Sequence, residues 1–156
     1  MKNILITGAT GFIGQRLVRA TDAKIKILSR TKRHDYETII CDFEKNSIPS
    51  NVLDGIDAVF HLAGFAHDLR YEKKVEGLYR KVNVDATIEL GKLAVRSGVK
   101  RFVLVSSVKA GGGGSSDRCA TETDQGIPEG VYGETKREAE LELLKLGKES
   151  GMHVAI

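Results

Sequence analysis

The sequence predicts an α/β domain built on a parallel sheet, and three observations lead to that fold class. Short apolar runs alternate with longer segments of helical periodicity along all 156 residues, as in successive crossover units. The run 58–62 is apolar on both sides, which is typical of a strand buried in a parallel sheet. A glycine-rich turn, 8–14, joins the first strand to the first helix. At this length we expect one domain, residues 1–156.

Six strands are expected, most of them short apolar runs bounded by polar residues or glycine. The expected ranges are 2–7, 25–28, 37–41, 58–62, 101–106 and 152–156. The first stops at Gly8, and the fifth has an apolar centre at 102–105. The sixth has only begun where the sequence stops. We therefore expect this chain to be the front part of a larger protein, without a substrate lobe.

Helices are expected where apolar residues recur at spacings of three and four. The first opens at Phe12 and runs to Ala20. The other expected ranges are 49–53, which is brief, 71–97 and 131–150. Gly98 and Gly151 stand directly after the two long segments, where a left-handed C-terminal cap is expected.

Composition narrows the function classes. The apolar fraction of 41% is a little below the roughly 45–50% of globular proteins, but at this length it still fills a core. The 24 basic and 21 acidic residues are mixed along the chain and leave a net charge of +3, so nothing favours nucleic-acid binding. The 17 glycines indicate tight turns or close backbone approach. The glycine- and serine-rich run 111–116 is interpreted as a mobile loop.

Cysteine usage and hydropathy indicate a cytoplasmic protein. Cys41 and Cys119 are too few for a disulfide scaffold, and we expect reduced thiols. No charged leader with an apolar stretch precedes the first strand. No apolar run approaches the roughly 18 residues that a membrane span needs. We therefore expect neither a signal peptide nor a membrane partner.

Metal and hydrolase chemistry have little support. The histidines are scattered, and neither cysteine has a partner at metal-ligand spacing, so no metal site is predicted. His61 is expected to be a packed residue at a strand end. A Gly-x-Ser-x-Gly nucleophile elbow does not occur.

The turn 8–14 has the spacing G-x-x-G-x-x-G and favours the binding of a dinucleotide diphosphate. Gly8 can make the tight turn, Gly11 lets the backbone approach the phosphates, and Gly14 lets helix and strand pack closely. Bare amides and the positive end of the helix dipole then face the phosphates. The competing interpretation is a plain glycine-rich connection. The residues expected at the cofactor are Gly8, Thr10, Gly11, Phe12, Ile13 and Gly14.

The end of the second strand predicts which cofactor binds. A carboxylate there would bond a ribose 2′-hydroxyl and favour NAD, but none occurs before Asp35. Arg30, with Arg33 as a second candidate, can clamp a 2′-phosphate, and Ser29 adds a hydroxyl. We therefore predict NADP, with NAD as the alternative. A solvated basic loop is the competing interpretation.

Asp42 and Phe43 follow the third strand directly. Because ligands of open parallel sheets bind beyond the carboxyl ends of the strands, this pair is expected to meet the adenine. A surface turn is the alternative interpretation of Asp42.

Tyr132 and Lys136 form a Tyr-x-x-x-Lys pair on one face of the last predicted helix. A nearby ammonium favours the phenolate, so such a phenol can act as an acid or base near neutral pH. Ser107 closes the fifth strand and can hydrogen-bond the oxygen that Tyr132 protonates. Asn83 lies mid-helix, where an amide is unhelpful to the helix, and can fix Lys136 or a water. Each residue alone also fits a structural role.

In combination these residues resemble the extended short-chain dehydrogenase/reductases, the NAD(P)-dependent epimerase/dehydratase group. Five motifs, spread over the whole chain, occur in the order and approximate spacing of that family. They are Thr7-Gly8-Ala9-Thr10-Gly11-Phe12-Ile13-Gly14, His61-Leu62-Ala63-Gly64, Asn83-Val84-Asp85-Ala86-Thr87, Ser106-Ser107-Val108-Lys109 and Tyr132-Gly133-Glu134-Thr135-Lys136. Within the group, Ser-Ser-Val-Lys and the segment Glu122-Thr123 look most like bacterial nucleotide-sugar epimerases and 4-keto-sugar reductases.

The resemblance implies a Rossmann sheet with strand order 3-2-1-4-5-6 and helices on both faces. It implies an NAD(P)-dependent oxidoreductase or epimerase whose catalytic residues are Ser107, Tyr132 and Lys136, supported by Asn83. Tyr132 and Lys136 are also expected at the cofactor, where Lys136 can bind ribose hydroxyls. Tyr132 would exchange a proton with a sugar oxygen while a hydride passes between nicotinamide and sugar. The segment Leu62, Ala63 and Gly64 would lie against the adenosine half of the cofactor. A nucleotide-sugar substrate and a homodimer are the implied partners.

The chain also departs from the family pattern. Glycines occupy 111–114, where the family usually has polar residues. Ser29 and the basic Arg30 weaken the argument for a tightly held NAD of the epimerase kind. Family members continue for more than a hundred residues that bind the nucleotide-sugar, so we expect this chain alone to bind cofactor with little or no turnover. Two alternatives stay open, a non-catalytic NADP(H) sensor and a reductase of a non-sugar carbonyl.

Overall fold

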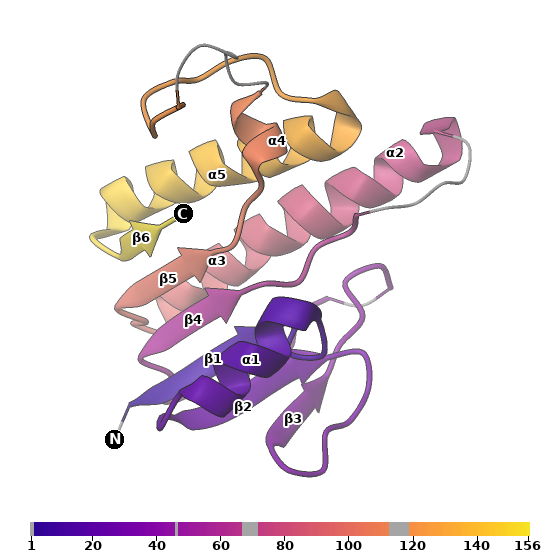
Figure 1. Ribbon diagram of the computed structural model, residues 1–156. Coiled ribbons are helices and arrows are strands. Elements are labelled where there is room, and N and C mark those ends of the chain that lie inside the picture. Colours follow the sequence, from indigo (N-terminus) through magenta and orange to yellow (C-terminus); the bar gives the residue numbers. More distant parts are fainter. Residues whose placement is uncertain (1, 46, 67–71, 113–118) are drawn as a thin grey trace.

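A six-stranded, all-parallel sheet forms the centre of the molecule. The computed structural model describes residues 2–45, 47–66, 72–112 and 119–156 (Figure 1). The strands lie in the order β3-β2-β1-β4-β5-β6, so that the chain reverses direction across the sheet after β3. This confirms the predicted Rossmann order. The strands are β1 (Asn3–Thr7), β2 (Lys24–Ser29), β3 (Glu37–Ile40), β4 (Ala58–His61), β5 (Arg101–Leu104) and β6 (His153–Ala155).

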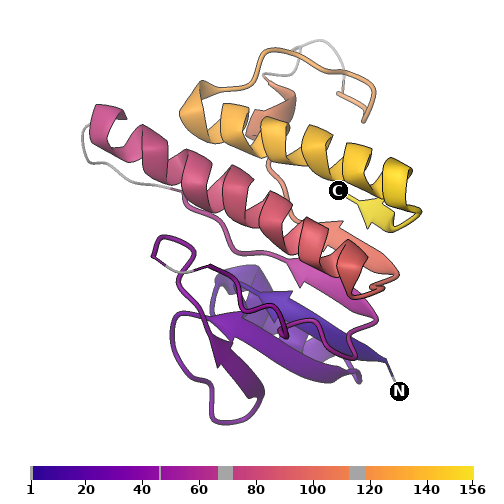
Figure 2. The ribbon, with the colours of Figure 1, turned by 180° about the vertical axis from the view of Figure 1, so that it is seen from behind.

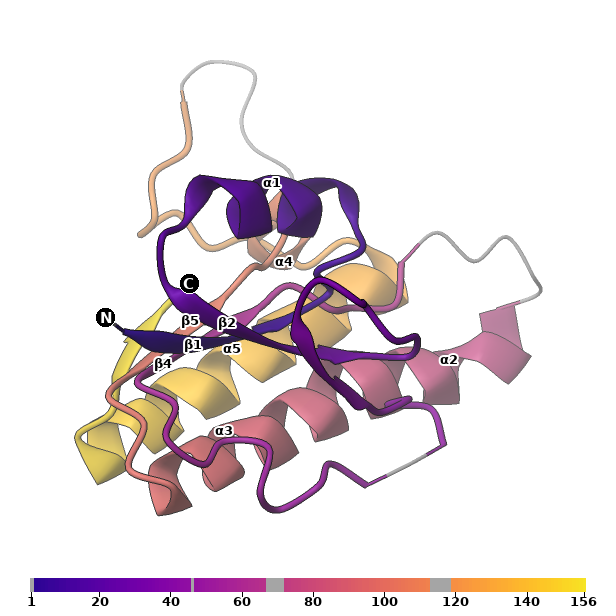
Figure 3. The ribbon, with the colours of Figure 1, turned by 90° about the horizontal axis from the view of Figure 1, so that it is seen from below.

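Helices cover both faces of the sheet. The view from below shows α1 on one face and the longer helices on the other (Figure 3). Seen from behind, the α2–α3 rod and α5 run side by side (Figure 2). The helices are α1 (Phe12–Ala20), α2 (Glu72–Arg80), the π-helical turn η1 (Lys81–Asp85), α3 (Ala86–Arg96), α4 (Val108–Gly111) and α5 (Gly130–Ser150).

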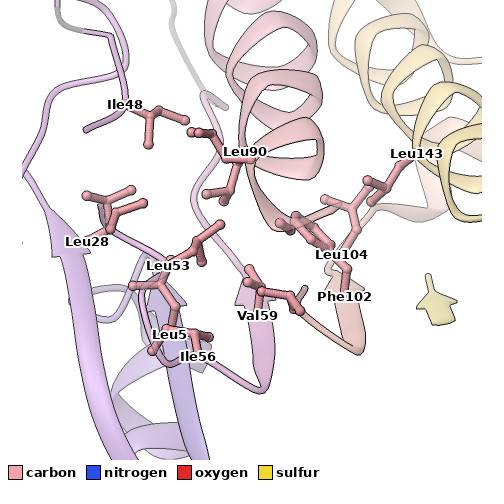
Figure 4. Close-up of a cluster of buried hydrophobic side chains, with 14 of the residues drawn as sticks. Leu5, Leu28, Ile48, Leu53, Ile56, Val59, Leu90, Phe102, Leu104 and Leu143 are labelled. Atoms are coloured by element: carbon pink, nitrogen blue, oxygen red, sulfur yellow. The ribbon is translucent and has the colours of Figure 1, made fainter. Parts of the chain in front are cut away.

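Two apolar layers fill the spaces between the sheet and its helices. Successive residues of β1 point to opposite faces, and both faces are buried: Ile4 and Ile6 pack toward α1, whereas Leu5 joins the larger cluster toward α3 and α5. That larger cluster includes the fully buried Phe102 and Leu143 (Figure 4). The sequence pattern of a sheet buried on both sides is thereby explained.

The expected brief helix at 49–53 is wrong. The chain there makes successive tight turns, in which the amides of Val52 and Asp54 donate to the carbonyls of Pro49 and Asn51 at 3.1 and 3.2 Å. Val52 and Leu53 are fully buried in the larger cluster. Their apolar character therefore reflects burial beneath the sheet rather than helical periodicity.

The long helix expected over 71–97 is present but interrupted. The π-helical turn η1 separates α2 from α3, and Tyr71 lies outside the described residues. Gly98 and Gly151 adopt left-handed φ angles of 72° and 76°, as the predicted caps require. The fifth strand ends at Leu104, earlier than expected, because the chain turns into the short helix α4.

Of the loop expected at 111–116, residues 113–118 lie outside the described residues. Within the described part of the chain, no helix combines the length and the apolar character that a bilayer crossing requires.

Candidate functional site

A cleft of about 400 Å³ opens beyond the carboxyl ends of β1 to β4. This edge lies at the point where the strand order reverses, which is where open α/β sheets bind ligands. Most of the predicted cofactor residues meet there, although they come from four separate segments of the chain. The predicted residues that line the cleft are Gly8, Thr10, Gly11, Ser29, Arg30, Asp42, Phe43, Leu62, Ala63 and Gly64.

The glycine turn forms one wall of the cleft. Gly8 has a left-handed φ of 69°, and its Cα faces the backbone just after β4, where a methyl group would lie 2.6 Å from the Ala63 nitrogen. Helix α1 starts after Gly11 without a side-chain cap and without an acidic residue in its first turn. Its first amides and the positive end of its dipole are therefore available to an anion. Phe12 and Ile13, expected at the cofactor, are largely exposed and do not line the cleft.

Sequence reasoning missed several lining residues, among them Cys41, Glu44, Phe65 and Val82. Cys41 and Glu44 flank the predicted pair 42–43, so the rule that ligands bind at strand ends could have included them. Phe65 and Val82 reach the cleft only because η1 packs against the segment after β4, which no local pattern reveals.

Lys136 is deeply buried behind the cleft, on α5. Only 3% of this residue is exposed, and its Nζ donates a hydrogen bond of 2.8 Å to the Val105 carbonyl at the end of β5. Burial lowers the pKa of Lys136 to about 8, although the Glu140 carboxylate acts in the opposite direction. The ammonium therefore titrates near neutral pH, in the range where it can exchange protons with a neighbouring group.

Tyr132 and Ser107 lie at the start of α5 and at the start of α4. The two helices touch backbone to backbone, because a methyl group at Gly133 would overlap the Lys109 carbonyl oxygen. Ser107 caps α4 and its Oγ accepts a hydrogen bond of 3.3 Å from the Lys109 amide. The Tyr132 ring packs against Tyr79, with centroids 6.2 Å apart. Ser107 therefore follows β5 at a turn whose helix packs directly on the turn of α5 that carries Tyr132.

Asn83 lies in η1 and joins the cleft to α5. Its Oδ1 accepts from the Phe65 amide at 2.8 Å, and its Nδ2 donates to the Phe65 carbonyl at 3.1 Å and to Thr135 Oγ1 at 3.2 Å. We expected Asn83 to fix Lys136 or a water, and the described hydrogen bonds take Asn83 to Thr135 and Lys136 to Val105. Asn83 thus holds the neighbour of Lys136 rather than Lys136 itself.

His61, at the end of β4, is fully buried as expected and bonds two threonines. Its Nδ1 lies 2.7 Å from Thr7 Oγ1 and its Nε2 lies 2.9 Å from Thr87 Oγ1. Burial, with a smaller effect from the charge of Lys136, lowers the pKa of His61 to about 3.

This pKa predicts that stability falls with acid. Between about pH 6.5 and 3 the unfolded chain takes up a proton at His61 and the folded chain does not, so acid favours unfolding. We expect a loss from this group of about 1 kcal/mol in the free energy of unfolding between about pH 6 and 5, measured by urea denaturation. His61→Gln should remove this dependence, whereas the exposed control His153→Gln should keep it. An unchanged slope in His61→Gln would contradict the assignment.

A parallel sheet in this order, with a glycine turn and a cleft at the reversal of strand order, defines a Rossmann-type domain. The chain belongs to the NAD dependent epimerase/dehydratase family, whose model matches residues 4–156.

Its relatives include sugar epimerases. The chain is 38% identical to UDP-glucose 4-epimerase of Vibrio cholerae over 167 residues, which cover 99% of this chain and 50% of that protein. It is 32% identical to the N-acetyl-alpha-D-glucosaminyl-diphospho-ditrans,octacis-undecaprenol 4-epimerase of Escherichia coli O157:H7, over 88% of this chain and 41% of that protein. The chain therefore spans half or less of the length of these relatives.

Solved structures share the fold. MoeE5 in complex with UDP-glucuronic acid and NAD matches with a TM-score of 0.83 and 31% identity, over 97% of this chain and 52% of that chain. UDP-glucose 4-epimerase of Thermotoga maritima, in a structure with UDP-glucose, matches with a TM-score of 0.84 over 97% of this chain and 53% of that chain. At 23% identity, the second match is a likeness in fold alone.

Proposed function

We propose that residues 1–156 form the NAD(P)-binding domain of an oxidoreductase or epimerase that acts on a nucleotide-linked sugar, with the sugar held by a further part of the protein. The observation that carries this proposal is the convergence of ten predicted residues on one cleft, whose wall is tied through Asn83 to the helix of Tyr132 and Lys136. The sugar epimerases among the relatives support the substrate class.

The cleft has parts suited to each portion of a dinucleotide. The glycine turn and the uncapped start of α1 suit the diphosphate. Asp42 and Phe43 line the end where the adenine would lie, opposite Ala63 and Gly64 on the other side of the turn. Exposed Arg30 at the rim, with Ser29, suits a 2′-phosphate. We therefore propose NADP ahead of NAD, although MoeE5 was solved with NAD.

The proton chemistry falls to three side chains. Bound nicotinamide supplies or accepts the hydride. Tyr132 exchanges a proton with the sugar oxygen, and Lys136 lies one helical turn away on α5. Because Ser107 Oγ accepts from the Lys109 amide, its own proton is free to donate to the same sugar oxygen. Asn83 sets the position of this part of α5 through Thr135.

The cofactor assignment predicts a preference that titration can measure. We expect this chain to bind NADPH about tenfold more tightly than NADH, because Arg30 adds a charge-assisted contact to the 2′-phosphate. Arg30→Gln should remove the preference by weakening NADPH alone. Lys32→Gln is the matched control, since Lys32 is an exposed cation of the same loop that does not line the cleft. A tenfold preference for NADH would overturn the role of Arg30, and failure to bind either nucleotide would overturn the proposed function.

Reduction of a non-sugar carbonyl is the second candidate, because the relatives also include a 3-beta-hydroxysteroid dehydrogenase of Mycolicibacterium neoaurum, 30% identical over 96% of this chain and 44% of that protein. We further propose that the protein is cytoplasmic. We also propose that it pairs through its long helices, since Leu141 and Leu144 on α5 are about half exposed.

A further inference from the structure

A chain of buried hydrogen bonds runs beneath the cleft. His61 lies at its centre, bonded on one side to Thr7 and on the other to Thr87. All three residues are at most 1% exposed, and none lines the cleft. The proton chemistry described above uses none of them.

The partners of the two threonines fix the direction of every bond in this chain. Thr87 Oγ1 donates its single proton to the Asn83 carbonyl at 2.8 Å, so it can only accept from the His61 Nε2–H. Thr7 Oγ1 accepts from the Ala63 amide at 3.1 Å, which leaves its proton to donate to His61 Nδ1. The ring is thus a neutral imidazole protonated at Nε2, in agreement with the low pKa that burial imposes.

The two ends of the chain close on the same segment of the cleft wall. At one end the Ala63 amide is held by Thr7. At the other end Asn83, whose carbonyl binds Thr87, holds both the amide and the carbonyl of Phe65 through its side chain. Residues 63–65 are therefore held at both ends by hydrogen bonds that are linked to one another through the His61 imidazole. A histidine that only filled the core would not connect the two ends of this segment.

We propose that His61 is a positioning residue, which holds the cleft wall 63–65 and the Asn83 turn in a single register through Thr7 and Thr87. The consequence is that the wall depends on His61 and Thr87, whose side chains make no described hydrogen bond to it. The effect on dinucleotide affinity rests on the proposed function. The effect on the structure of the wall does not depend on it.

The ring state is tested first, by ¹⁵N NMR of the histidine side chains of this chain. We expect the His61 ring to remain neutral and protonated at Nε2 down to about pH 5. A ring protonated at Nδ1, or an imidazolium at about pH 6, would overturn the proposal.

Transmission is tested by amide hydrogen exchange in Thr87→Val, a change of similar shape that removes the acceptor of the Nε2–H. We expect exchange at the Phe65 amide to rise about fivefold, although Thr87 makes no described hydrogen bond to Phe65. Thr87→Ser, which restores the hydroxyl, should bring the rate back within about twofold. Thr38→Val is the matched control, because Thr38 bonds Arg33 and Tyr36 near β3, outside the chain of His61. An unchanged exchange rate at the Phe65 amide in a folded Thr87→Val protein would show that His61 and Thr87 do not hold the cleft wall 63–65.

The functional consequence is tested by titration of the same variants with NADPH. We expect Thr87→Val to weaken binding about fivefold, with Thr87→Ser within about twofold of wild type. If the wild-type chain binds no dinucleotide, the proposed function fails. The NMR and exchange measurements still decide whether His61 holds the cleft wall 63–65. Unaltered NADPH affinity in Thr87→Val, with binding intact in wild type, would overturn the positioning role.

Discussion

Gly14→Ala is expected to destabilise the fold strongly and to abolish dinucleotide binding. A methyl group at Gly14 would overlap the Gly8 carbonyl oxygen and would lie 2.7 Å from the Ala9 Cα, so it meets backbone rather than a side chain that can move. Gly8 cannot retreat, because its own Cα is packed against the backbone of Leu62 and Ala63. We expect a loss of at least about 2 kcal/mol in the free energy of unfolding, measured by urea denaturation.

Gly77→Ala provides the matched control for this effect. Gly77 lies in α2 with no atom within 4 Å of its would-be methyl group. The same substitution there should raise stability by about 0.5–1 kcal/mol, because alanine favours the helix and restricts the unfolded chain. A Gly14→Ala protein as stable as wild type would show that α1 does not approach the glycine turn as closely as described.

The strand ends were the most predictable part of the site. The parallel sheet brings the carboxyl ends of β1, β2, β3 and β4 to one edge, so residues read off four separate runs share one cleft. This prediction needs only the order of elements and the rule for ligands of open sheets. Phe12 and Ile13 do not line the cleft with their largely exposed side chains, so their predicted contact with the cofactor stays a prediction that rests on the backbone amides of the first turn of α1.

The contacts behind the cleft could not be predicted from local patterns. The Thr7–His61 and Asn83–Thr135 bonds join residues more than fifty positions apart. The sequence predicted one continuous helix over 71–97, whereas a π-helical turn places Asn83. In the same way, Lys136 could be chosen from its spacing to Tyr132, but its burial and its bond to Val105 depend on how α5 packs over β5. The sequence was enough to choose the candidate site residues. Their hydrogen-bond partners could be known only from the folded structure.

Lys136→Met is expected to make the chain more stable. In the folded protein the pKa of Lys136 is about 8, below its ordinary value of 10.5. At neutral pH the folded state therefore holds a charge that burial disfavours, by an amount on the order of 3 kcal/mol. Methionine fills a similar volume without charge, but leaves the Val105 carbonyl without this donor, at a cost of about 1 kcal/mol. We expect a net gain of about 1–2 kcal/mol.

The pH dependence separates this explanation from simple repacking. Between about pH 8 and 10.5 the unfolded chain keeps the proton on Lys136 and the folded chain loses it, so raising the pH stabilises wild type relative to Lys136→Met. The advantage of the variant should therefore shrink as the pH rises from about 7 to 10 in urea denaturation. Lys145→Met, at an exposed position of the same helix, should change stability by less than about 0.5 kcal/mol at either pH. If wild type is the more stable protein at neutral pH, the bond from Nζ to Val105 outweighs the burial of the charge. Lys136 would then stabilise the folded chain, contrary to this prediction.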